Sequence, residues 1–281
     1  MTAKALLLLV LLSAPSSASA SRKAAPSAWD WRNDVELSFV ETSGNSMSRV
    51  FSGANTLEFT GRSWLAETKV SALHGKTRDL VTAERFLAFE KLRWYWSDDN
   101  YVFEKLLWKR DRFAGLRYRF DFSAGLGHRV FKTKRSMLEL EAGGGQILEH
   151  EIQDVNHRGD SYKATGKYTY AFGPRASFEQ DAEYTHNLRK GSDSRHQLVS
   201  TLTAPLSKRL SLRMSFDYEF NHRPPPGIMR VDRTWNTSIV VSFGDPALSL
   251  DTDEDYGEID PDDAAPAPDP PADSGDGDDG G

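Results

Sequence analysis

The sequence predicts an all-β fold: an antiparallel up-and-down transmembrane β-barrel of about 12 strands, followed by a disordered acidic C-terminal tail. Segments in which apolar and polar residues alternate recur between Asp34 and Phe243. After the first twenty residues, no apolar stretch has the length that a membrane-spanning helix needs. The connections between segments also alternate between tight and long. Because lipid cannot satisfy the backbone of open strands, a membrane-spanning chain of this kind must close into a barrel.

Residues 1–20 have the features of a secretion signal. Lys4 gives a positive start, residues 5–12 form an apolar core, and residues 18–20 (Ala-Ser-Ala) form a small-residue cleavage site. The apolar core is too short to span a bilayer as a helix. The chain has no cysteine, which excludes lipoprotein acylation at this site and fits an oxidising compartment without disulfides. We therefore expect a mature chain that begins near Ser21 outside the cytoplasm.

The first predicted strands follow a short N-terminal periplasmic segment, 21–33, and open a barrel that we place at 34–243. In the first strand, Val35, Leu37 and Phe39 alternate with Glu36 and Ser38. The strands that follow, up to the middle of the chain, cover residues 49–59, 64–74, 84–96, 101–110, 118–126 and 138–142.

The later strands alternate more regularly. In the last one, Trp235, Ile239 and Phe243 fall on one face of an extended chain, and Asn236 and Ser238 fall on the other. An aromatic start and a terminal Phe resemble the closing strand that the barrel-insertion machinery recognises. The later strands cover residues 162–172, 176–184, 197–204, 210–220 and 235–243. An even strand number is expected when both ends of a single-chain barrel lie in the periplasm.

Two predicted strands conflict with a simple lipid-facing side. Glu90 shares a face with Phe86 and Leu92, and Glu104 shares a face with Val102 and Leu106. A carboxylate that faces lipid is costly near the membrane midplane and tolerated near its surface. We therefore expect either a register bulge in these strands or an incorrect face assignment for one of them.

The predicted connections separate into two rims. Tight turns are predicted at 61–62, 97–100, 133–135, 173–174 and 206–208, and longer loops at 75–82, 111–116, 148–158, 188–195 and 221–230. The exception is the short first loop at 43–45. Short turns at one rim and long loops at the other are typical of outer-membrane barrels. Five tryptophans lie at the predicted periplasmic rim, where an aromatic girdle is expected: Trp29, Trp31, Trp64, Trp94 and Trp96.

Residues 244–281 differ in composition from the barrel. They contain 14 Asp or Glu and no Lys or Arg, with repeated Pro and Gly. Such a segment cannot form a core, so we expect a disordered tail in the periplasm. The whole chain carries a formal charge of −6 and the tail −14, which leaves +8 on residues 1–243. A solubilising appendage is the favoured interpretation over calcium binding or a tether to a basic partner, because no EF-hand-type loop is present.

A resemblance to a known family rests on the run Arg110-Asp111-Arg112-Phe113-Ala114-Gly115-Leu116-Arg117-Tyr118-Arg119, followed by Ala124-Gly125-Leu126-Gly127. Residues 42–46 and 84–85 also match. The sequence between Trp31 and Phe243 resembles the YdiY-like, salt-induced outer-membrane protein family, a largely uncharacterised group. The resemblance implies an outer-membrane barrel without assigned chemistry. The acidic segment after the closing strand departs from the family pattern.

No catalytic or metal constellation stands out. Six of the seven histidines fall at the predicted outer rim, on different loops and without ligand spacing. We expect no enzyme activity, no metal and no cofactor. Charged residues of both signs are expected to face the lumen, with Lys163 and Lys167 pairing with Glu179 and Asp181, which suggests a narrow or plugged pore. The lumen-facing candidates are Arg119, Glu139, Glu141, Lys163, Lys167, Glu179, Asp181, Glu183 and Arg213.

The sequence therefore predicts a bacterial outer-membrane β-barrel with a structural or envelope-stress role, or a narrow small-solute channel. The alternatives are a barrel enzyme that acts on lipids and a soluble periplasmic β-protein. The expected partners are outer-membrane lipids and, during assembly, the barrel-insertion machinery. We expect no nucleic-acid partner and a monomeric protein.

Overall fold

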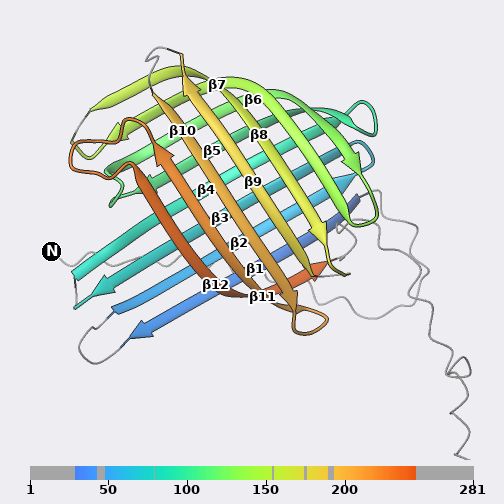
Figure 1. Cartoon of the computed structure of the whole chain (residues 1–281), viewed down its shortest axis with the longest axis horizontal. Helices are drawn as coiled ribbons and strands as arrows, with labels where there is room; N and C mark the ends of the chain where they lie inside the picture. The colour runs from blue at the N-terminus through green and yellow to red at the C-terminus, as the bar shows by residue number, and fades with distance from the viewer. Residues whose placement is uncertain are drawn as a thin grey trace, which may run out of the picture.

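The computed structural model describes residues 29–244, apart from 43–47, 79, 154, 174–175 and 189–192. These residues form a closed barrel of twelve antiparallel strands, in which each strand pairs with its sequence neighbours and β1 pairs with β12 (Figure 1). The predicted fold class is confirmed. The strands are β1 (Trp29–Thr42), β2 (Ser48–Gly61), β3 (Trp64–Thr77), β4 (Leu80–Tyr95), β5 (Asn100–Asp111), β6 (Leu116–Lys132), β7 (Ser136–Glu151), β8 (Asn156–Ala171), β9 (Ser177–Asn187), β10 (Ser194–Pro205), β11 (Leu210–Asn221) and β12 (Val231–Gly244).

The predicted signal, at residues 1–20, and the acidic tail after Gly244 lie outside the described residues, so these predictions stay predictions. In the described part of the chain, no helix is long and apolar enough to cross a membrane.

The barrel is apolar outside and polar inside, the reverse of a soluble protein. On β6, Phe122 and Leu126 are 47% and 60% exposed, whereas Asp121 and Ser123, on either side of Phe122, are each 1% exposed. The side chains of a strand point alternately to the two faces of the sheet, so a single strand supplies both surfaces. Lipid favours the apolar outer face, and the inner face needs polar partners. This alternation makes the fold a transmembrane β-barrel.

The barrel begins earlier than predicted. β1 begins at Trp29, five residues before the expected start at Asp34, so part of the expected N-terminal segment belongs to the barrel wall. The reason is pairing with β2, because Trp29 lies opposite Gly61 and Trp31 lies opposite Phe59. β1 and β12 close the barrel with Arg32 opposite Gly244.

Strands β4 and β5 pair without a register shift, and both carboxylates face outward. Glu90 is exposed while the next residue, Lys91, is buried, and Glu104 is exposed while the preceding residue, Phe103, is buried. The expected error in face assignment is therefore wrong. Register shifts do occur in both strands, but only near the loop-rim ends, where β4 pairs with Gly75 and Lys76 of β3 and where β5 pairs with β6 between Lys109 and Asp111, and they do not turn Glu90 or Glu104 inward. The inward side chains of β4 fix the register, because Lys91 needs an acidic partner in the interior.

The two rims differ less than predicted. The terminal rim is the one at which β1 begins and β12 ends, and the loop rim is the opposite one. The predicted long loops at 75–82 and 148–158 are wrong, because the hairpin ladders continue to Thr77 opposite Leu80 and His150 opposite Asn156. The longest connection at the loop rim is 222–230, between β11 and β12.

The connection 222–230 folds back over the loop rim toward the far side of the barrel. Its Pro225 is buried, and a side chain added at Gly115, between β5 and β6, would contact Pro225 at 3.2 Å. β5 and β11 are six strands apart in the closed barrel, so this connection crosses the mouth. Pro224, Pro225, Ile228 and Met229 line the space beneath it.

Candidate functional site

All nine residues predicted to face the lumen lie in the barrel interior. Glu139, Glu141 and Lys163 are buried, and the other six line internal cavities: Arg119, Lys167, Glu179, Asp181, Glu183 and Arg213. One expected cross-wall contact forms, between Lys167 Nζ and Glu179 Oε2 at 3.3 Å. The other expected contacts of Lys163 and Asp181 do not form. Lys163 instead binds Asp121 on β6 at 2.7 Å, because Thr185 and not a carboxylate lies opposite it on β9.

The first charged group is an ion-paired cluster against the wall of β4 to β7, which we call the inner cluster: Lys91, Arg93, Tyr101, Arg129, Glu139 and Glu141. Lys91 Nζ donates to both oxygens of Glu141 at 2.7 and 2.8 Å, and the Tyr101 hydroxyl donates to the same carboxylate at 3.0 Å. Arg93 and Arg129 bind Glu139 at 3.1 and 3.5 Å. A carboxylate with this many donors is stabilised in its charged form despite burial.

Glycine creates the space for the inner cluster. Tyr101 is fully buried, and its ring lies against Gly127 on β6, where any added Cβ would overlap the ring. The bare backbone at Gly127 therefore lets the Tyr101 side chain lie along the wall and reach Glu141 on β7. The sequence search missed Lys91, Arg93 and Tyr101. Their partners lie up to three strands away, so only the closed barrel brings them together.

A second set of ion pairs crosses the lumen in the half near the loop rim. Lys109 Nζ on β5 binds Glu219 on β11 at 2.7 Å, although these strands are six apart in the barrel. Lys105 on β5 binds Glu183 on β9 at 2.8 Å. These pairs brace opposite walls and narrow the lumen.

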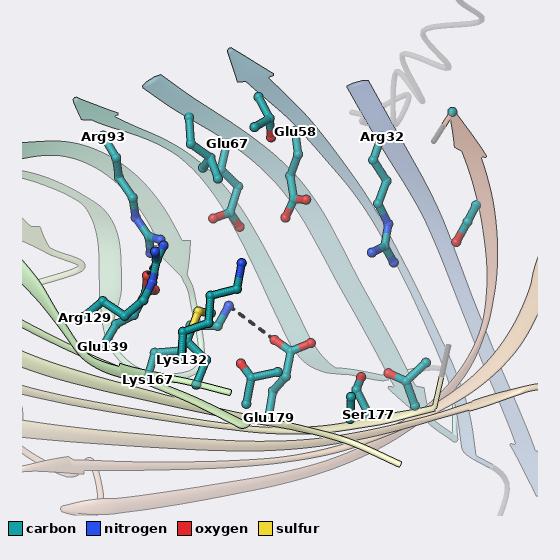
Figure 2. Close-up of a pocket in the computed structure, with 18 of the residues that line it drawn as sticks. Arg32, Glu58, Glu67, Arg93, Arg129, Lys132, Glu139, Lys167, Ser177 and Glu179 are labelled. Atoms are coloured by element: carbon teal, nitrogen blue, oxygen red, sulfur yellow. Dashed lines mark hydrogen bonds and ion pairs between the residues drawn. The ribbon is translucent and has the colours of Figure 1, made fainter. Parts of the chain in front are cut away.

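Two large cavities lie in the interior formed by the described residues. The terminal-rim chamber has a volume of about 930 Å³, and the loop-rim chamber has about 560 Å³. Figure 2 shows the terminal-rim chamber, with Glu58 and Glu67 facing Lys167 and Glu179 across the open space. The chambers adjoin, because six residues line both of them. We call these six the neck: Arg32, Glu58, Glu67, Lys167, Glu179 and Arg213.

The neck carries more free negative than free positive charge. Each of its cations binds a carboxylate: Arg32 binds Asp34 at 2.8 Å, Lys167 binds Glu179, and Arg213 binds Asp34 and Glu36 at 3.2 and 3.0 Å. Glu58 and Glu67 lie directly opposite each other on β2 and β3 and form no ion pair within the described residues. The uncompensated charge of the neck is therefore negative.

Most rim histidines belong to an aromatic belt on the outer face. His150 stacks on Tyr118 with ring centroids 5.1 Å apart, and His196 lies 4.9 Å from the Tyr184 ring. His157 instead binds Glu151 at 2.9 Å. Among the described residues, no group of three or more His, Cys, Asp or Glu has a geometry that could hold a metal ion. The absence of metal, cofactor and enzyme activity stays a prediction.

Fold and interior together define a twelve-strand transmembrane β-barrel with a polar lumen, which resembles outer-membrane porins and channels. The chain belongs to the family described as "Protein of unknown function, DUF481", whose model matches residues 35–243. It is 20% identical over 195 residues to "Uncharacterized protein YdiY" of Escherichia coli (strain K12), which covers 69% of this chain and 76% of YdiY. The predicted YdiY-like family is confirmed. Induction by salt stays a prediction.

Solved structures of outer-membrane proteins match the chain at low identity. The NanC porin is 11% identical and matches 75% of this chain and 97% of its own chain, with a TM-score of 0.44. The COG4313 outer membrane channel from Pseudomonas putida F1 is 10% identical and matches 81% of this chain and 100% of its own, with a TM-score of 0.48.

Proposed function

We propose that this protein is an outer-membrane channel that conducts small polar solutes and prefers cations to anions. The observation that carries the proposal is the pair of adjoining chambers inside the closed barrel, joined by the neck. In this proposal the terminal rim faces the periplasm and the loop rim faces the outside. The exposed apolar belt contacts outer-membrane lipids, and the barrel acts as a monomer.

The size of the chambers limits the solute. At about 30 Å³ for each water molecule, the larger chamber corresponds to roughly thirty waters. The ion pairs between Lys109 and Glu219 and between Lys105 and Glu183 divide the other chamber. The lumen therefore suits inorganic ions and small metabolites rather than folded or polymeric cargo.

The charge of the chamber walls favours cations. Among the described strand residues that line the chambers, five carboxylates form no ion pair: Glu58, Glu67, Asp181, Asp217 and Asp232. On the strands, Lys69 is their one cationic counterpart in this group. The connections at the rims add further lining charges of both signs: Arg62, Lys208, Arg209, Arg230, Asp98 and Asp99. Unpaired carboxylates that line a constriction stabilise passing cations and repel anions. The negative excess thus supports cation preference.

Planar-bilayer recordings of the purified protein test this proposal. Heat-modifiable gel mobility first establishes that the barrel is folded. The folded protein is expected to give stepwise conductance and, under a KCl gradient, a reversal potential of the sign that K⁺ permeation produces. A folded barrel that gives no conductance would contradict the channel.

The alternative function is structural: a rigid envelope barrel with a braced interior and a role in envelope stress. The ion pair between Lys109 and Glu219, which crosses the lumen, favours it because such a contact stabilises the barrel while it obstructs the lumen. Absent conductance together with high resistance to unfolding would support this alternative.

A further inference from the structure

The mouth of the terminal-rim chamber is basic at the point where the chain leaves the barrel. Arg62 lies in the turn between β2 and β3, and Lys208 and Arg209 lie in the turn between β10 and β11. All three are exposed, line the terminal-rim chamber and form no ion pair within the described residues. We call these three residues the basic mouth. The acidic residues of this mouth, Asp98 and Asp99, lie on the turn between β4 and β5.

The two basic turns flank the exit of the chain. In the closed barrel, β12 and β1 lie between β11 and β2. Ser242 N donates to the Arg209 carbonyl at 2.9 Å, two residues before Gly244. Gly244 itself lines the chamber. The next residue of the chain therefore starts beside the basic mouth.

The sequence that starts there is strongly acidic. Residues 244–281 contain 14 Asp or Glu and no Lys or Arg, and four of these acids lie between Asp251 and Asp255. Eleven residues beyond Gly244 can span at most about 40 Å when extended. A barrel of twelve strands with the usual spacing and tilt is about 25 Å across. The first acidic group can therefore reach every part of the mouth.

We propose that the acidic segment 245–281 docks on the basic mouth of its own barrel. Opposite charge brings the segment to the mouth, and covalent attachment beside Arg209 keeps its effective concentration there high. Carboxylates of the segment then pair with Arg62, Lys208 and Arg209. The docking does not depend on the proposed channel function.

Disulfide cross-linking in the full-length mature protein tests the docking, because the chain has no native cysteine. The reporter pair is Leu206→Cys in the exposed turn beside the basic mouth and Asp253→Cys in the acidic segment. Mild oxidation in about 50 mM salt is expected to form an intramolecular bond. In about 1 M salt, where charges are screened beyond about 3 Å, the bond should form at least about fivefold more slowly.

Two control proteins make the cross-link specific. The first carries the reporter pair on a barrel with R62Q, K208Q and R209Q, and it should form the bond at least about fivefold more slowly. The second pairs D253C with F113C, an exposed position at the loop rim, and should form no intramolecular bond. Equal rates in wild-type and neutralised barrels, or a cross-linked dimer as the main product, would overturn the proposal. The dimer would show that the tail of a second copy occupies the mouth.

Conductance separates this inference from the channel proposal. A cross-link without any conductance would retain the docking and contradict the channel. Conductance without a salt-sensitive cross-link would retain the channel and contradict the docking.

Discussion

The inner cluster and the neck use the same residue types in opposite ways. In the inner cluster, Lys91 and Glu141 are 11% and 6% exposed at their side chains and bind each other at 2.7 Å. In the neck, Glu58 and Glu67 face an open chamber and each other, with no ion-pair partner in the described strands. The same residue type therefore links strands in one region and lines an open chamber without an ion pair in the other.

The difference shows how position in a barrel determines the effect of a charge. A buried pair holds two walls together, and loss of one partner leaves an uncompensated charge in a low-dielectric interior. An unpaired charge beside a chamber remains solvated, so it contributes little stability but sets the potential that a passing ion meets. Changes in the inner cluster should alter stability, and changes in the neck should alter ion selectivity.

The largest effect is expected for Glu141→Leu in the inner cluster. This change removes the acceptor of Lys91 and of the Tyr101 hydroxyl and leaves the ammonium buried without its partner. The free energy of unfolding should fall by about 3–5 kcal/mol. Urea unfolding of the barrel in lipid vesicles, followed by tryptophan fluorescence, measures the loss.

The double variant K91M/E141L is the matched control. It removes both charges and keeps an apolar volume, so it should recover most of the stability that E141L loses. The cation preference of both variants should match that of wild type. A change of selectivity as large as the one in neck variants would break the distinction between the two regions.

The ion pair of Lys109 and Glu219 is expected to give a mixed effect, because it is paired but borders a chamber. The variant K109A/E219A should lower the free energy of unfolding by about 1–2 kcal/mol, since it removes a partly exposed charge-assisted contact between opposite walls. It should also raise the single-channel conductance. The variant K109M/E219M keeps the side-chain volume without the charges, so an equal rise in conductance there would contradict a steric obstruction.

The sequence reveals the local features of this barrel and not the ones that depend on closure. Alternation along β12, in which Trp235 is 74% exposed and Val240 is 1% exposed, is a property of one strand and is legible in the sequence. The pair of Lys91 and Glu141 joins strands three apart, and the pair of Lys109 and Glu219 joins strands six apart. The stagger and diameter of the closed barrel determine such contacts, and no single segment encodes them.

Strand ends could not be predicted for a related reason. The loop-rim ladders continue through polar residues such as His150 and Asn156, where hydropathy alone indicates a loop. The alternation of polar and apolar residues predicts the lumen-facing candidates, but it does not predict the neck. Glu58 and Glu67 become a distinct feature only because the two chambers meet beside them.

A smaller effect, confined to selectivity, is expected for E58Q/E67Q in the neck. Removal of two uncompensated charges should lower the ratio of K⁺ to Cl⁻ permeability by about threefold to tenfold. The free energy of unfolding should stay constant or rise by about 0.2–1 kcal/mol, because like charges opposite each other on paired strands repel. Reversal potentials under a KCl gradient measure the first quantity, and urea unfolding measures the second.

The matched control for the neck removes a charge at a rim position. It is Glu41→Gln on the outer face, where Glu41 binds Arg49 at 2.8 Å. This carboxylate does not line a chamber, so its loss should leave the permeability ratio unchanged. An equal drop in both variants would mean that net charge of the protein, and not the neck, sets the selectivity.

The smallest effect is expected for Glu90→Leu, on the outer side of the wall that carries the inner cluster. Lys91 fixes the register of β4 from inside, so its neighbour Glu90 must face lipid. A lipid-facing carboxylate costs less than a cation at the same depth, and the cost falls toward the interface. Replacement by Leu should therefore raise the free energy of unfolding by about 1 kcal/mol in bilayers. The gain should vanish in a zwitterionic detergent whose headgroups can solvate the carboxylate. A gain of equal size in detergent would instead mean that Glu90 strains the packing of the wall. The register of β4 would then cost free energy at Glu90, and the ion pairs of the inner cluster would offset that cost.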